Sequence, residues 1–229
     1  MNGADRNVDA AHAQMHSLML QGPAGHLEAL LNAGSTTATH AALVCHPHPL
    51  YGGTMHNKVV YHAAKALNGI GFPVLRFNFR GTGRSGGRHD GRAESEDVQA
   101  ALDWVAQEFG LPIVCAGFSF GAAMSLLAGC SDRRVACLVA LGTPIAAEGR
   151  VYAYSFLANC TKPKLFVSGT EDEFGPKTEV ERVFRGAAAP KRLVWIEQAG
   201  HFFEGKLPEM RSAVEQWVSG TLEVNRDTQ

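Results

Sequence analysis

Residues 114–123, VCAGFSFGAA, contain a G-x-S-x-G pentapeptide centred on Ser119. This pattern is typical of a nucleophile elbow, a sharp strand-to-helix turn whose strained serine requires Gly117 and Gly121, because bulkier residues at these positions would not fit. The apolar run 111–118 favours a strand, and the Ala-, Met- and Leu-rich run 120–129 favours a helix. We therefore predict that the Ser119 hydroxyl stands at the end of a strand, where a reacting group can approach it.

The composition limits the kind of protein. With 229 residues, of which 45% are hydrophobic and 19% charged, the chain can form one sizeable core, and we predict one domain. The formal net charge of -1 and the lack of a Lys/Arg run argue against nucleic acid or an acidic membrane as partner, and favour a small neutral substrate. No apolar run approaches the roughly 20 residues of a membrane span, and the N-terminus lacks an apolar signal-peptide core, so we predict a cytoplasmic protein.

Apolar runs and turn signals predict the order of the elements. A hairpin comes first, because two short strand-like runs flank Pro23-Ala24-Gly25, and apolar strands then alternate with helices. The predicted strands are 16–22, 26–34, 41–49, 72–79, 111–118, 134–144, 163–172 and 191–200, and the predicted helices are 56–67, 92–109, 120–129, 177–185 and 206–222. The fold class is therefore α/β, a mostly parallel, doubly wound sheet of about eight strands with an N-terminal antiparallel hairpin. We predict a flexible lead-in over 1–14, a single domain over 15–222 and a C-terminal tail over 223–229.

Two later loops carry candidate partners for Ser119. A serine hydroxyl needs a base to take its proton and a third group to orient that base, and α/β sheets place such groups after the carboxyl ends of strands. Asp172 and His201 each lie just past a predicted strand core, and the order Ser119, Asp172, His201 is typical of nucleophile-elbow enzymes. Glu171 and Glu173 flank Asp172 and stay open as alternatives for the acid.

These segments together resemble a known family. GFSFG (117–121), GTED (169–172), AGHFF (199–203) and RGTGRS (80–85) resemble the α/β-hydrolase superfamily across about residues 15–222. HPHPLYGGTMHNKVV (46–60) is similar to small bacterial serine hydrolases related to dienelactone hydrolase, which have little or no cap domain. The resemblance implies the α/β-hydrolase fold and a Ser-His-Asp esterase-type mechanism, without implying which ester is cleaved.

The mechanism needs two backbone N–H groups for the oxyanion. The first is expected from Phe120, the residue after the nucleophile, and the second from the loop over 46–53. The two prolines of that loop lack an N–H, which leaves His48, Leu50 or Tyr51. His48 matches the usual position in the resembling family and is the preferred choice.

Residues 145–162 occupy the place where relatives of this family insert a lid. The segment is too short for a cap domain, so we predict a minimal or absent cap and an open site for short acyl groups. Tyr51, Phe118 and Tyr152 are the predicted substrate-contacting residues, although aromatic side chains in such places can equally be packing residues.

Motifs for metals and cofactors are weak. His46 and His48 lack a third ligand at a familiar spacing. Residues 81–86 match G-x-G-x-x-G, but no helix opens at the last glycine, so we interpret them as a tight loop in which Arg80 or Arg84 pairs with an acid. We predict no cofactor and no metal. The five cysteines have no C-x-x-C spacing and are predicted to be reduced, mostly buried thiols: Cys45, Cys115, Cys130, Cys137 and Cys160.

The sequence thus favours a serine hydrolase that cleaves a small carboxylic ester through an acyl-Ser119 intermediate. A thioesterase, lactonase or aminopeptidase would use the same residues. A non-catalytic ligand-binding protein of the same fold is the alternative from another class, although binding alone has no need of a strained serine turn. A homodimer would be ordinary for this fold class.

Overall fold

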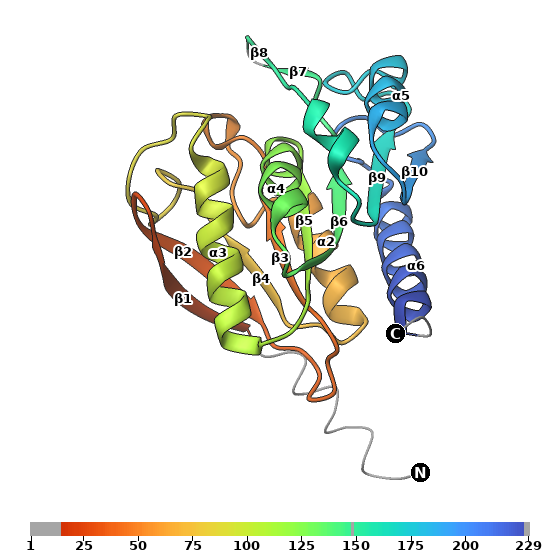
Figure 1. Ribbon diagram of the computed structural model, residues 1–229. Coiled ribbons are helices and arrows are strands. Elements are labelled where there is room, and N and C mark those ends of the chain that lie inside the picture. Colours follow the sequence, from red (N-terminus) through yellow and green to blue (C-terminus); the bar gives the residue numbers. More distant parts are fainter. Residues whose placement is uncertain (1–14, 148, 227–229) are drawn as a thin grey trace.

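The computed structural model describes residues 15–147 and 149–226 (Figure 1). The predicted lead-in over 1–14 lies outside the described residues. One sheet runs through the described part, in the order β1-β2-β4-β3-β5-β6-β9-β10. Its strands are β1 (Met15–Gly22), β2 (Gly25–Asn32), β3 (Ala41–Cys45), β4 (Val74–Phe77), β5 (Ile113–Phe118), β6 (Val135–Leu141), β9 (Lys164–Gly169) and β10 (Lys191–Ile196). Strand β2 pairs antiparallel with β1 and β4, whereas all the later pairings are parallel, which confirms the predicted fold class.

Helices cover both faces of the sheet. Helices α2 (Lys58–Gly69) and α6 (Leu207–Arg226) pack on one face, and α3 (Glu94–Phe109), α4 (Phe120–Ser131) and α5 (Lys177–Gly186) pack on the other (Figure 1). Successive residues of the central strands therefore belong to different cores: Cys115 faces α3 and α4, whereas Ala116 faces α2 and α6. All five cysteines are free, and only Cys130 is not fully buried.

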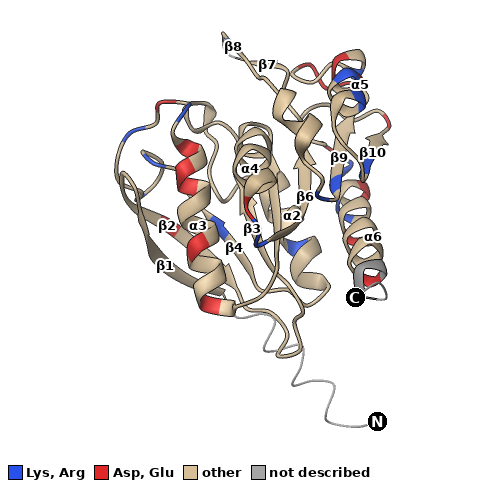
Figure 2. Cartoon of the chain, in the orientation of Figure 1, with Lys and Arg blue, Asp and Glu red and all other residues tan. Residues whose placement is uncertain are grey.

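The glycine-rich loop after β4 is held by ion pairs. Figure 2 shows acidic residues along α3, and the first turn of this helix faces the loop. Arg80 lies 2.7 Å from Asp97 and 3.3 Å from Glu96, and Arg84 lies 3.3 Å from Glu28. The prediction that an arginine of this loop pairs with an acid is confirmed. These ion pairs give both arginines of the loop a structural role.

The segment between β6 and β9 carries no cap domain over its described residues, 142–147 and 149–163. In the described residues it holds a hairpin of two strands with two residues each, β7 (Ala146–Ala147) and β8 (Arg150–Val151). One short 3-10 helix, η2 (Ser155–Asn159), follows. Ala147 and Tyr152 of this segment contribute to the wall of a cavity at the carboxyl ends of the strands.

The C-terminal boundary differs from the prediction. Helix α6 continues to Arg226 and does not end at Leu222, so the predicted tail over 223–229 begins as helix. The reason is that no proline or glycine follows Leu222 to end the helix. Across residues 15–147 and 149–226, no helix has the length and apolar character that crossing a membrane requires.

Candidate active site

Ser119 stands on a strained turn between β5 and α4. Its φ of 54° and ψ of -121° lie in a region that side-chain-bearing residues rarely adopt. A Cβ at Gly117 would overlap the carbonyl oxygen of Gly121, and a Cβ at Gly121 would lie 2.5 Å from the carbonyl oxygens of Cys45 and His46. Both positions thus require glycine, because backbone atoms lie where a Cβ would be. At Gly121 these atoms belong to Cys45 and His46, so the end of β3 and the loop after it pack directly against the elbow.

This packing makes Gly121→Ala strongly destabilising. We expect the added methyl group to lower the free energy of unfolding by about 3 kcal/mol or more, because the three atoms nearest to it are backbone atoms and cannot move aside as a flexible side chain can. Gly220→Ala in α6 is the matched control: its Cβ would meet nothing within 4 Å, so it should gain about 0.5–1 kcal/mol of helix propensity. Urea unfolding of both variants measures the two effects, and equal stabilities would contradict the elbow geometry.

Three predicted side chains meet in a hydrogen-bonded row. Ser119 Oγ lies 2.9 Å from His201 Nε2, and His201 Nδ1 lies 2.9 Å from both carboxylate oxygens of Asp172. The His201 and Asp172 side chains are buried. An Nδ1–H that donates to Asp172 leaves Nε2 to accept the Ser119 proton, which is the arrangement that general-base catalysis requires.

Asp172 itself is oriented by backbone groups. Its Oδ1 accepts the N–H of Phe174 at 2.9 Å and of Gly175 at 3.0 Å. Glu171 and Glu173, the alternatives from the sequence, are both exposed. The structure therefore brings Asp172, and neither neighbour, to His201.

Phe118 lies elsewhere than predicted. It is fully buried, and its ring packs on that of His201 with centroids 4.9 Å apart, below the site. The alternation of β5 directs Phe118 toward α2 and α6, and it does not line the cavity at Ser119. The structure therefore does not bring Phe118 to the cavity wall, and its ring packs against the His201 ring instead.

The loop over 46–53 lies beside the elbow. The N–H of Leu50 donates to His48 Nδ1 at 3.3 Å, and the N–H of Tyr51 donates to the His48 carbonyl at 3.2 Å, within the 3-10 helix η1 (Pro49–Tyr51). Those two amides are thus used inside the turn, and the choice of His48 as the second oxyanion donor stays a prediction. Phe120 is the first residue of α4, where an N–H has no acceptor within its helix.

His46 is a buried structural residue. Its Nδ1 donates to the Pro47 carbonyl at 2.6 Å, and its Nε2 accepts the N–H of Phe79 at 3.0 Å. Both ring nitrogens are therefore engaged, which argues against a metal-ligand role for this histidine. Burial lowers the pKa of His46 to about 3, so the ring is neutral at neutral pH. Residues 15–147 and 149–226 hold no group of three or more His, Cys, Asp or Glu side chains suited to a metal ion.

The buried neutral His46 predicts a loss of stability in acid. The unfolded chain binds a proton near the ordinary histidine pKa, whereas the folded chain does not until about pH 3, so stability falls as the pH drops below about 6.5. Between pH 7 and pH 5 the cost is about 2 kcal/mol. We expect His46→Gln, which does not titrate, to lose about 2 kcal/mol less than wild type over this interval in urea unfolding. Equal pH dependence would contradict the assignment, and the exposed His56→Gln is the control.

A cavity of about 210 Å³ opens at Ser119 and His201. Tyr51 and Tyr152, both predicted, lie in its wall. The full lining is Pro47, His48, Tyr51, Gly53, Asn57, Ser119, Ala147, Tyr152, Phe174, His201 and Phe202. Sequence reasoning missed Phe174 and Phe202, although their closeness in sequence to Asp172 and His201 was a usable signal. It also missed Asn57 and Ala147, for which the sequence carries no such signal.

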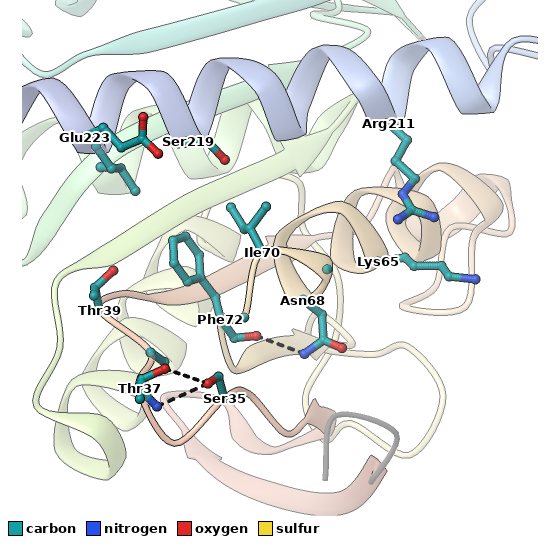
Figure 3. Close-up of a pocket in the computed structure, with 14 residues that line it drawn as sticks. Ser35, Thr37, Thr39, Lys65, Asn68, Ile70, Phe72, Arg211, Ser219 and Glu223 are labelled. Carbon is teal, nitrogen blue, oxygen red and sulfur yellow. Dashed lines mark hydrogen bonds between the residues drawn. The ribbon is translucent and has the colours of Figure 1, made fainter. Parts of the chain in front are cut away.

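A hollow larger than the cavity at Ser119 lies at the opposite end of the sheet. Its volume is about 660 Å³. Figure 3 shows the residues that line it, near the amino ends of β3 and β4. Several of its polar groups satisfy one another: Asn68 Nδ2 donates to the Phe72 carbonyl at 2.9 Å, and the hydroxyls of Ser35 and Thr37 lie 2.9 Å apart. Because α/β sheets build their reactive sites at the carboxyl ends of strands, the smaller cavity at Ser119 is the candidate active site.

The fold and this site define an α/β hydrolase with a serine at the elbow. A family described as "Alpha/beta hydrolase domain" matches residues 41–224, and the chain belongs to this family. The expected resemblance is thus confirmed.

Several relatives share most of the chain. An uncharacterised protein of Rickettsia prowazekii is 34% identical over 212 residues, 89% of each chain. A solved structure described as an alpha-beta serine hydrolase homologue from Coxiella burnetii is 38% identical, with a TM-score of 0.81 over 88% of this chain and 96% of the other. XC6422 from Xanthomonas campestris, described as an a/b serine hydrolase without lid, is 32% identical, with a TM-score of 0.79 over 90% and 94%.

Proposed function

We propose that this protein is a serine hydrolase that cleaves a small carboxylic ester through an acyl intermediate on Ser119. The observation that carries the proposal is the continuous row from Ser119 through His201 to Asp172, with 2.9 Å at each step, at the wall of a cavity. Serine hydrolase relatives with more than 30% identity support the same class.

The geometry suggests a role for each group. His201 Nε2 takes the hydroxyl proton as Ser119 Oγ attacks the ester carbonyl, and Asp172 stabilises the imidazolium that forms. The N–H groups of Phe120 and His48 stabilise the oxyanion. His201 then protonates the leaving alcohol and later activates the water that releases the acid. A cavity of about 210 Å³ suits a short acyl group.

The strained turn argues against a purely binding role. A serine at φ 54° costs stability and is retained where the surroundings enforce it, as Gly117 and Gly121 do here.

The test of the proposed function is intact-mass spectrometry after incubation with a fluorophosphonate, together with turnover of acetate-to-octanoate esters. A single adduct and a preference for short esters are expected. Folded protein that forms no adduct and turns over no ester would overturn the proposal.

A further inference from the structure

A second hollow adjoins the cavity at Ser119. This shallow cleft of about 550 Å³ shares His48 and Tyr51 with the cavity. Its other walls come from the loop before α3, at 89–92, and from the β7–β8 hairpin, at 149–151. A molecule that binds across Ser119 can therefore extend into the cleft.

Two arginines line this cleft. Arg92 is exposed and Arg150 is half-buried. Among residues 15–147 and 149–226, neither guanidinium forms an ion pair with a carboxylate. The cleft thus presents two cations whose donors are not taken up by acids of the described chain.

Asp90 and Glu94, two acids of the described chain near the cleft, are engaged in other contacts. Asp90 Oδ1 accepts two backbone N–H groups at the start of α3, at 2.7 and 2.9 Å. Glu94 is buried, accepts two N–H groups of the same loop at 2.9 and 3.1 Å, and lies 2.6 Å from His89 Nδ1. Burial, with His89 and Arg150 nearby, lowers the pKa of His48 to about 4, so this ring is neutral at neutral pH. Arg92 and Arg150 are the Lys and Arg side chains that line the cleft.

Arg150 is fixed beside the reacting centre. Its guanidinium carbon lies 4.9 Å from the ring centroid of Tyr152 and 5.7 Å from that of Phe120. Both contacts are cation–π interactions, which hold an arginine in place and leave its edge free to bind an anion. Because Phe120 directly follows Ser119, the charge sits close to the elbow.

We propose that this cleft binds a carboxylate that the substrate carries away from the scissile ester. The inference rests on the proposed function and narrows the substrate class to short esters with a negative charge. A guanidinium offers two parallel N–H donors that match a carboxylate, and such bonds are among the strongest in proteins. The net charge of -1, which favours a neutral substrate in the sequence analysis, is a sum over the whole chain and does not report on this cleft.

The experiment uses two pairs of substrates that differ only in carboxylate against carboxamide. One pair carries the group on the acyl side, the glutarate monoester of para-nitrophenol and its terminal amide; the other carries it on the alcohol side, para-acetoxybenzoate and para-acetoxybenzamide. For Arg150→Gln we expect kcat/KM to fall by roughly 10- to 100-fold for the carboxylate member of one pair, and by less than about twofold for its amide. The pair that responds identifies which side of the ester enters the cleft.

Arg133→Gln is the matched control, because it removes the same charge from an exposed turn. This turn precedes the amino end of β6, whereas the cleft lies at the carboxyl ends of the strands. We expect this variant to leave all four substrates unchanged. The inference would be overturned if Arg150→Gln lowered kcat/KM equally for the carboxylate and the amide in both pairs, or lowered it in neither pair. Hydrolysis of these esters by the wild type would still support the proposed function. Wild-type protein that hydrolyses none of the four esters would overturn both.

Discussion

Ser119→Ala is expected to lower kcat for a short ester by about 10⁶-fold and to abolish labelling by a fluorophosphonate. The change removes only the Oγ atom, whose contact is His201 Nε2 at 2.9 Å. The fold should be retained, because alanine keeps the Cβ that already occupies the turn. Turnover, intact mass and thermal unfolding of the same sample measure the three effects.

Ser125→Ala provides the control for this result. Ser125 is a buried serine of helix α4, which follows Ser119, and its hydroxyl donates to the Ala122 carbonyl at 3.0 Å. This variant should keep both labelling and turnover. If Ser119→Ala stayed active, or if the label remained on it, another residue would have to be the nucleophile and the proposed mechanism would fall.

Asp172→Asn is expected to lower kcat by about 10⁴-fold with little change in stability. The asparagine oxygen can still accept the N–H groups of Phe174 and Gly175, so the loop keeps its shape. Its NH₂ group, however, would donate to His201 Nδ1 and move the ring proton to Nε2. His201 could then no longer accept the proton of Ser119.

The neighbouring acids supply matched controls for Asp172. Glu171→Gln and Glu173→Gln remove the same charge from exposed positions on either side, and each should change kcat by less than about threefold. Steady-state kinetics of the three variants at neutral pH decide the assignment. A large loss in either glutamate variant, with an active Asp172→Asn, would transfer the orienting role to that glutamate.

Much of this site could be predicted from the sequence, because short-range patterns locate its parts. The glycines of the elbow identify Ser119, and Asp172 and His201 each follow an apolar strand. Parallel strands then bring their carboxyl ends to one edge. The same reasoning predicted a sheet of about eight strands, and the structure has this sheet together with the three side chains within hydrogen-bond distance.

Features that depend on three-dimensional packing were not accessible in this way. Strand β5 is buried on both faces, so its unbroken apolar run did not reveal that Phe118 points away from the cavity. Arg92 and Arg150 come from distant loops, and only their shared cleft makes them neighbours. The two glutamates beside Asp172 are separated from it by the structure, in which both are exposed and Asp172 is hydrogen-bonded to His201.

The position of His201 determines what a measurement of activity reports. His201 follows β10, the last strand of the sheet, most of whose side chains are only partly buried, whereas Ser119 follows the fully buried β5. Edge elements open at a lower free energy than central ones. Separation of β10 from β9 would remove the general base while the rest of the sheet stayed paired. Hydrolysis therefore reports the integrity of this edge, and its disappearance on heating or in denaturant need not coincide with cooperative unfolding of the whole domain.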